Sequence, residues 1–133
     1  MNQSYIFDSY ALLELLEDGP GAGIVADILT ISDNRVWVSN ISLGEIYYIL
    51  LRRRSYKEAE AVIDTILLGE TIEMAEADWP RIKQAAVIKA GGSLSYADLF
   101  VIALGLEKKA TVVTGDPEII EKAGKLEVDV LAI

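Results

Sequence analysis

Carboxylates are the side chains of this sequence best suited to chemistry, because histidine and cysteine are both absent. The absence excludes a Ser-His-Asp triad, an imidazole acid–base pair, a cysteine nucleophile and a thiolate zinc site. Hydrolysis would have to use carboxylates, lysine, tyrosine, hydroxyl groups or a metal ion held by oxygen ligands. Four acids draw attention by their position, namely Asp8, Glu45, Asp98 and Asp116.

Three of these acids are placed where predicted strands end and helices begin. Asp8 and Asp116 each follow a short β-type run directly and precede a helical pattern. Glu45 lies in the first turns of the helix that follows the predicted strand Val36–Val38. Because ligands of open α/β sheets bind at the carboxyl ends of strands, these positions favour a shared site.

Asp98 has a different context, at the start of a helical pattern with no clear strand before it. It is the only charged residue between Leu94 and Leu106, a segment that is apolar on nearly all sides. Such a helix is normally buried. A charge on it needs a partner or a metal ion, and no Lys or Arg lies three or four residues away.

If the four acids converge, their repulsion has to be compensated. Two carboxylates ~4 Å apart repel by about 4 kcal/mol at an effective dielectric constant of 20. Either some of them hold protons or a divalent cation lies between them. An all-oxygen ligand set favours Mg²⁺ or Mn²⁺ over zinc. Such ions lower the pKa of bound water and stabilise charge during phosphoryl displacement, which is chemistry that needs no histidine.

A purely structural role is also open for each acid. Asp8 and Asp116 are good helix N-caps, the latter with proline at the next position. The segments Ser42–Glu45 and Ser95–Asp98 both have the spacing of a capping box.

The elements that would position these acids alternate along the chain. The predicted strands are Tyr5–Phe7, Val36–Val38, Thr71–Met74, Thr111–Thr114 and Val128–Ile133. The predicted helices cover residues 12–16, 23–31, 41–54, 56–68, 80–91, 95–109 and 117–122. This alternation predicts one α/β domain over residues 1–133, with a mostly parallel central sheet covered on both faces.

The four acids and their neighbours resemble a known family, the PIN-domain ribonucleases, and in particular the VapC-like toxins of prokaryotic toxin–antitoxin pairs. The resemblance extends over essentially the whole chain and implies a PIN-like three-layer α/β/α sandwich. The motifs that carry it are Ile6-Phe7-Asp8-Ser9, Ser42-Leu43-Gly44-Glu45-Ile46, Ser95-Tyr96-Ala97-Asp98-Leu99 and Val113-Thr114-Gly115-Asp116.

The resemblance implies a site and an activity. Its catalytic and metal-binding residues would be the four acids Asp8, Glu45, Asp98 and Asp116. The hydroxyl groups of Ser9 and Thr114 would support them. It implies an endoribonuclease that depends on Mg²⁺ or Mn²⁺ and hydrolyses RNA, often structured RNA such as tRNA, with a metal-activated water as nucleophile. It also implies a homodimer and a cognate antitoxin.

The net charge of −9, from 12 basic and 21 acidic residues, disfavours non-specific binding to nucleic acid or anionic membranes. Two basic clusters could contact RNA, Arg52–Arg54 with Lys57 and the helix carrying Arg81, Lys83 and Lys89. We favour solvated helix ends for both. No apolar run approaches the length of a membrane span and the first residues lack a signal-peptide pattern, so we expect a cytoplasmic protein.

Other functions fit the sequence less well. A haloacid-dehalogenase-like phosphatase requires a second acid two residues after Asp8, where this chain has Tyr10. A receiver domain requires an early acidic pair, and the glycines of Gly19–Gly23 lack the Lys-Ser/Thr of a phosphate loop. The main alternative is a catalytically silent PIN-like module that acts through protein–protein contacts. The apolar helices 41–51 and 56–68 predict a groove for a second copy or an antitoxin.

Overall fold

The central sheet of the computed structural model, which describes residues 3–92 and 94–133, has five parallel strands in the order β3-β2-β1-β4-β5. The strands are β1 (Ser4–Phe7), β2 (Arg35–Ser39), β3 (Glu73–Ala75), β4 (Thr111–Thr114) and β5 (Val130–Ala132). From β1 the chain builds outward through β2 and β3, and it then crosses to the other side of β1 for β4 and β5. The predicted parallel sheet is confirmed.

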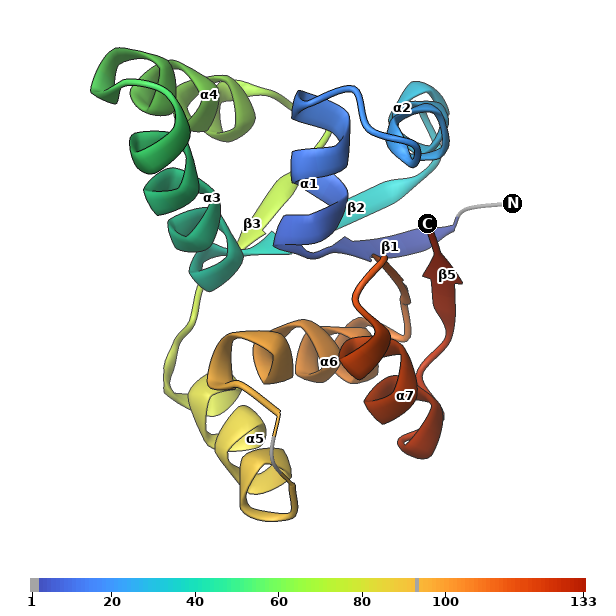
Figure 1. Cartoon of the computed structure of the whole chain (residues 1–133). Coiled ribbons are helices and arrows are strands. Elements are labelled where there is room, and N and C mark those ends of the chain that lie inside the picture. The colour runs from blue at the N-terminus through green and yellow to red at the C-terminus, as the bar shows by residue number, and fades with distance from the viewer. Residues whose placement is uncertain (1–2, 93) are drawn as a thin grey trace.

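Helices cover both faces of the sheet (Figure 1). One face carries α1 (Ser9–Leu16), α2 (Ala22–Thr30), α3 (Asn40–Arg53) and α4 (Tyr56–Leu68). The other face carries α5 (Trp79–Ala90), α6 (Tyr96–Lys108) and α7 (Pro117–Lys125). The architecture is therefore the three-layer α/β/α sandwich predicted from the sequence.

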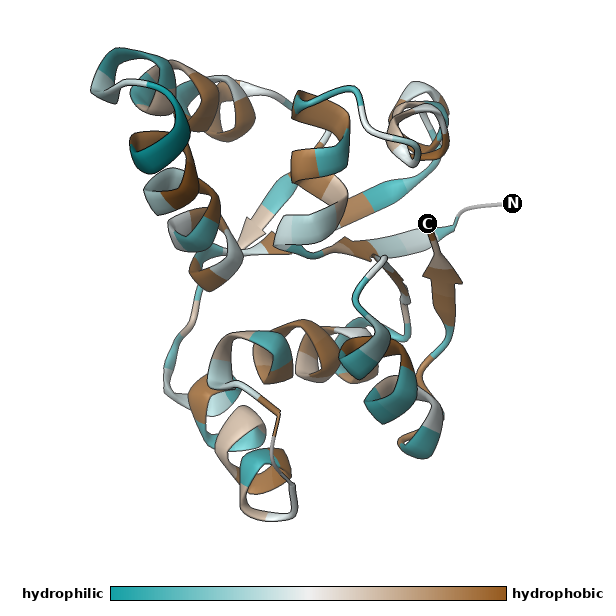
Figure 2. Ribbon diagram, in the orientation of Figure 1, coloured by the Kyte–Doolittle hydropathy of each residue, from teal (hydrophilic) through white to brown (hydrophobic). Residues whose placement is uncertain are grey.

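Two apolar cores lie on either side of the sheet because successive strand residues point to opposite faces. Ile6 and Val112 pack with α5, α6 and α7, whereas their neighbours Phe7 and Val113 pack with the helices of the other layer. Figure 2 shows apolar residues in the strands and along α6. Strands buried on both faces are apolar runs rather than alternating patterns, as the sequence shows.

Helix α6 is the central helix of its layer. Every residue from Leu99 to Gly105 is buried, and the helix contacts β1, β2 and β4. Gly105 allows the closest approach, since a Cβ atom there would lie 2.8 Å from Cγ1 of Val128 and 3.1 Å from Cγ2 of Val112. The burial of α6 fixes the position of its first turn, which carries Asp98.

One predicted cap is wrong and another is confirmed. Helix α3 begins three residues earlier than the capping box Ser42–Glu45 requires, because Ser39 accepts the hydrogen bond of the Ile41 amide at 3.1 Å. The hydroxyl of Ser42 is buried with no hydrogen-bond partner among the described residues. Ser95 does cap α6, accepting from the Asp98 amide at 3.3 Å.

The ends of other elements also differ from the prediction, and α1 begins at Ser9 rather than at residue 12. Strand β3 starts two residues later than predicted and β5 spans only Val130–Ala132, because pairing with β2 and β4 determines their extent. Helix α7 continues to Lys125 rather than ending at 122. Within the described part of the chain, no helix is long and apolar enough to cross a membrane.

Two glycine-to-alanine substitutions should change stability in opposite directions. Gly105→Ala should lower the free energy of unfolding by about 1–3 kcal/mol, because the new methyl group meets Val128 and Val112. Gly44→Ala, in the middle of α3 with no atom within 4 Å of its Cβ, should raise it by about 0.5–1 kcal/mol. Urea denaturation checks both, and stabilisation by Gly105→Ala would contradict the packing of α6.

Candidate active site

The predicted acids gather at the carboxyl-terminal edge of the sheet. Asp8 directly follows β1 and Asp116 lies two residues after β4. These strands are neighbours, and the direction in which the chain builds the sheet changes between them. Such a switch point is where open α/β sheets bind ligands, because the loops on either side diverge and leave a crevice.

Asp8 is the most buried of the four acids, with 3% of its surface exposed. Its Oδ1 accepts the amide of Ala11 at 2.8 Å, and its Oδ2 accepts the hydroxyl of Thr114. The oxygen of Thr114 in turn accepts the amide of Asp116 at 3.0 Å. This chain of hydrogen bonds joins the ends of β1 and β4, so Asp8 is both the N-cap of α1 and an oriented site residue.

Burial is the main reason why the pKa of Asp8 is raised from 3.8 to about 6. Hydrogen bonds from Thr114 and Ala11 lower the pKa, and the charges of Asp98 and Asp116 raise it further. A carboxylate taken out of water beside two others holds its proton more tightly. Asp98 and Asp116 therefore lie near enough to Asp8 for their charges to act on it.

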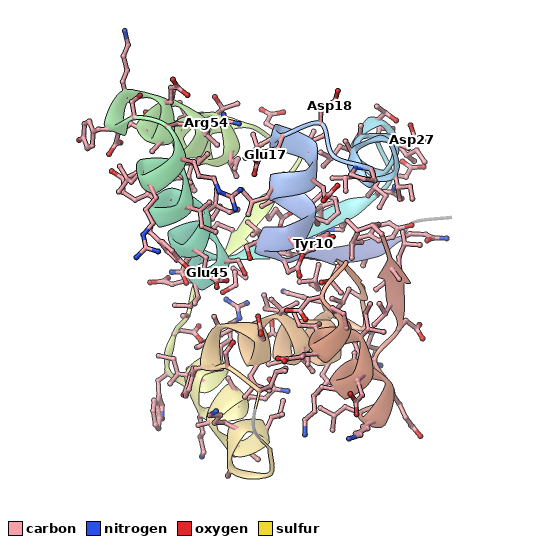
Figure 3. All side chains as sticks on the ribbon, viewed as in Figure 1. Tyr10, Glu17, Asp18, Asp27, Glu45 and Arg54 are labelled. Atoms are coloured by element: carbon pink, nitrogen blue, oxygen red, sulfur yellow. The ribbon has the colours of Figure 1, made fainter. Side chains whose placement is uncertain are left out.

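Asp98 and Glu45 extend the same cluster from α6 and α3. Burial raises the pKa of Asp98, the hydrogen bond of Ser95 lowers it, and the charges of Asp116 and Glu118 raise it. Burial also raises the pKa of Glu45, as does the charge of Asp98, whereas a hydrogen bond from the Ser9 side chain lowers it. Figure 3 places Glu45 near the end of α3 that lies closest to α6.

The donor set of this cluster fits a hard divalent cation. Every donor is an oxygen atom, which is the ligand type that Mg²⁺ and Mn²⁺ prefer. None of the ion pairs between described residues involves Asp8, Glu45, Asp98 or Asp116, so their mutual repulsion is uncompensated by Lys or Arg. No three acids of the described residues are close enough to form a ready-made metal cage.

The structure adds neighbours that sequence reasoning missed. The ring of Tyr10 lies against Gly115, where a Cβ atom would be 2.3 Å from Cε1 of the ring. Gly115 thus lets the loop between Thr114 and Asp116 pack on α1. Glu118, in the first turn of α7, adds its charge to the cluster. No sequence motif predicts that Tyr10, Gly115 and Glu118 lie near the site, because their positions depend on how a loop and the first turn of α7 pack.

The basic clusters singled out in the sequence are largely used in the fold. Arg53 pairs with Glu17 on α1. Arg81 binds both carboxylate oxygens of Glu107 at 3.0 Å. These contacts favour a structural role for Arg53 and Arg81 over a role in binding RNA.

Replacing Asp8 with asparagine should stabilise the metal-free protein at neutral pH. The folded protein binds the Asp8 proton more tightly than the unfolded chain, so the free energy of unfolding falls as pH rises from about 4 to about 6. Asp8→Asn removes this dependence. Its stability relative to the wild type should therefore increase over that range, by up to about 3 kcal/mol at pH 7. Urea denaturation in EDTA at several pH values measures the free energy of unfolding of both proteins. A difference between them that does not change with pH would contradict the prediction.

Comparison with known proteins identifies the family. The family model "PIN domain" matches residues 5–125. The fold is similar to VapBC of Salmonella typhimurium, solved bound to DNA, with a TM-score of 0.75, 16% identity and 98% of each chain covered. No curated protein matches the chain significantly.

Two further solved structures share the fold. Mycobacterium tuberculosis VapC20, described as a toxin that cleaves the sarcin–ricin loop, has a TM-score of 0.74 and 20% identity, over 88% of this chain and 93% of that one. A FitAB-type complex of Neisseria gonorrhoeae has a TM-score of 0.65 and 21% identity, over 96% of each chain. Because the family model matches residues 5–125, nearly the whole length, and the sheet and helices have the fold of these structures, the chain belongs to the PIN domain family.

Proposed function

We propose that this chain is a Mg²⁺- or Mn²⁺-dependent endoribonuclease and the toxin of a VapBC-type toxin–antitoxin pair. The observation that carries the proposal is the cluster of Asp8, Glu45, Asp98 and Asp116 at the switch point of the sheet. Burial and mutual repulsion raise the pKa of Asp8, Glu45 and Asp98, and no described ion pair relieves the repulsion. Carboxylates whose pKa values are raised by burial and by neighbouring charges are typical of functional sites.

The four acids would hold the ion, with Asp8 and Asp98 central and Glu45 and Asp116 completing the ligand set. When bound there, Mg²⁺ or Mn²⁺ would lower the pKa of a coordinated water and offset charge on the phosphate. The amide of Ala11 and the hydroxyl of Thr114 each occupy one lone pair of Asp8 and fix its orientation, and each oxygen retains another lone pair for a cation.

Ser9 and Asp116 have supporting contacts that suit this role. The side chain of Ser9 acts on Glu45 and lowers its pKa, against the effect of burial. Asp116 accepts the amide of Glu118 at 2.9 Å, which directs its carboxyl group at the start of α7. Water would be the nucleophile and an RNA phosphodiester the substrate. The structurally similar toxin described as cleaving the sarcin–ricin loop supports a structured RNA, and tRNA is a further candidate.

The partner of the toxin would be an antitoxin, which is supported by the VapBC and FitAB complexes among the similar structures. A groove of about 450 Å³ between α1, α2 and α4 suits an apolar helix of such a partner. Its lining is almost wholly aliphatic and consists of Leu12, Leu15, Leu16, Leu29, Ala61, Val62, Thr65, Ile66, Thr71 and Ile72. Helix α4 contributes to it and α3 does not. We also expect a homodimer.

A catalytically silent PIN-like binding module is the second candidate. It is favoured by the finding that no three described acids are close enough to form a ready-made cation cage. Two measurements separate the candidates. The enzyme binds Mg²⁺ or Mn²⁺ and cleaves RNA, whereas the silent module binds its protein partner without cleavage.

Asp98→Asn should abolish RNA cleavage, by at least about a hundredfold, without loss of fold, because it removes a charged ligand from the centre of the cluster. Cleavage of tRNA and ribosomal RNA is measured with Mg²⁺, with Mn²⁺ and with EDTA, together with circular dichroism. The matched control is Asp64→Asn, an exposed acid on α4 that should leave cleavage unchanged. Wild-type activity in Asp98→Asn, or cleavage that persists in EDTA, would refute the proposed site.

Ile66→Asp should weaken binding of the antitoxin by at least about tenfold, because a carboxylate in an apolar groove loses hydration without gaining a partner. Affinity is measured by calorimetry with the purified product of the adjacent reading frame. Leu68→Asp is the control, since Leu68 is 84% exposed and does not line the groove. Equal affinities for the two variants would exclude the groove as the docking site.

A further inference from the structure

We propose that Lys122 binds a backbone phosphate of the RNA a few nucleotides from the scissile bond, in a pocket between α7 and the segment that leads into α6. This inference rests on the proposed nuclease function and adds to it a residue that positions the substrate. The pocket has a volume of about 410 Å³ and is mainly polar. Its lining residues are Gly91, Gly92, Leu94, Glu118, Glu121, Lys122 and Lys125.

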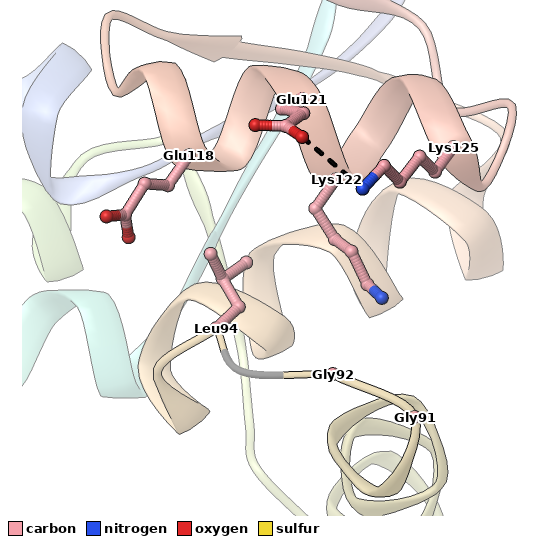
Figure 4. Close-up of a pocket in the computed structure, with 7 residues that line it drawn as sticks. All are labelled: Gly91, Gly92, Leu94, Glu118, Glu121, Lys122 and Lys125. Atoms are coloured by element: carbon pink, nitrogen blue, oxygen red, sulfur yellow. Dashed lines mark ion pairs between the residues drawn. The ribbon is translucent and has the colours of Figure 1, made fainter.

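The side chain of Lys122 extends from α7 into this pocket (Figure 4). Its nitrogen lies over Gly92, where a Cβ atom would be only 2.9 Å away. A glycine at this position therefore leaves the ammonium group room between the helix and the segment below it. Across the same segment, Lys89 at the end of α5 donates to the carbonyl oxygen of Leu94 at 2.7 Å.

The ion pairs around the pocket leave Lys122 available for a ligand. Glu121 pairs with Lys125 at 3.3 Å, on the exposed side of α7. Among residues 3–92 and 94–133, no carboxylate lies within 4.0 Å of the nitrogen of Lys122. Glu118 points away from the lysines in Figure 4. Lys122 is therefore a cation that the fold brings into a polar pocket without neutralising it.

The pocket adjoins the acid cluster through Glu118. This residue lines the pocket, and its charge also reaches Asp98. Asp116 caps the same helix, six residues before Lys122. At a rise of 1.5 Å per residue, the two lie about 9 Å apart along the axis of α7. Stacked nucleotides advance about 3.4 Å each, so about three nucleotides bridge the acid cluster and Lys122.

A phosphate is the ligand that this arrangement favours. The protein carries a net charge of −9, so an RNA strand needs a local cation to approach the acids. Arg53 and Arg81, the cations most prominent in the sequence, are engaged by Glu17 and Glu107. Lys122 instead lies on the helix that Asp116 caps and has no ion pair among the described residues. It would hold the strand by its backbone, without reading the base sequence.

The test compares Lys122→Gln with Lys57→Gln, which makes the same change of charge on α4, in the opposite layer. Both are made in the Asp98→Asn background so that RNA is bound and not cleaved. The probe is a short fluorescein-labelled single-stranded oligoribonucleotide of mixed sequence, titrated by anisotropy at several salt concentrations. We expect Lys122→Gln to raise the Kd about three- to tenfold and to reduce the slope of log Kd against log salt by about 0.7. Lys57→Gln should change neither quantity.

A second measurement uses the active enzyme. In the Asp98-intact protein, Lys122→Gln should raise KM with little change in kcat, because the lysine binds substrate outside the reacting bond. An unchanged salt slope, or the same effect from Lys57→Gln, overturns the inference. The slope of log Kd against log salt is measured without cleavage. The inference about Lys122 can therefore fail while the proposed nuclease function remains supported. Absence of cleavage in the wild type, with RNA binding intact, would instead overturn the nuclease function.

Discussion

The burial of Asp8 among other carboxylates at one edge of the sheet is the constraint on which the rest of this structure depends. Asp8 is almost fully buried and lies within the field of two other acids, so its charged form is disfavoured. The fold tolerates it because Thr114 and the amide of Ala11 donate hydrogen bonds to its two oxygens. These contacts join β1, α1 and β4, so the element ends that define the sheet edge also orient the acid.

The same edge explains why capping and catalysis are not competing interpretations here. Asp8 and Asp116 cap α1 and α7, as their sequence contexts predict, and both also belong to the acid cluster. A carboxylate at a helix N-terminus is stabilised by the amide groups and the helix dipole. That stabilisation helps to hold several negative charges near one another before any cation binds.

The two helix layers of the molecule differ in the chemistry of their pockets. Arg53 and Arg81 pair with acids of neighbouring helices, so the arginines of the two basic clusters are partly committed to the fold. An apolar groove between α1, α2 and α4 lies on one layer, and a polar pocket with Lys122 lies on the other. The two partners proposed above, an antitoxin and RNA, would accordingly approach different faces.

Much of the fold could be predicted because its elements are defined by local patterns. Apolar runs at Tyr5–Phe7 and Thr111–Thr114, and the apolar helix before Lys109, follow from burial on both faces of a parallel sheet. The cap of α3 could not be predicted, because Ser39 and Ser42 have similar local contexts. Only the pairing of β2 with β1 and β3 decides where that strand ends and the helix begins.

The sequence by itself determined the α/β class, the absence of histidine and cysteine chemistry, and the positions of Asp8, Asp98 and Asp116 at the starts of helices. Spacing along one chain is enough for those conclusions, because each concerns a single element and its neighbours. Only the tertiary structure decided which acids act on one another's charge, that Gly115 makes room for Tyr10, and that Lys122 enters a pocket also lined by Glu118. These relations join residues from different elements, and their distances depend on how α6 and α7 pack against the sheet.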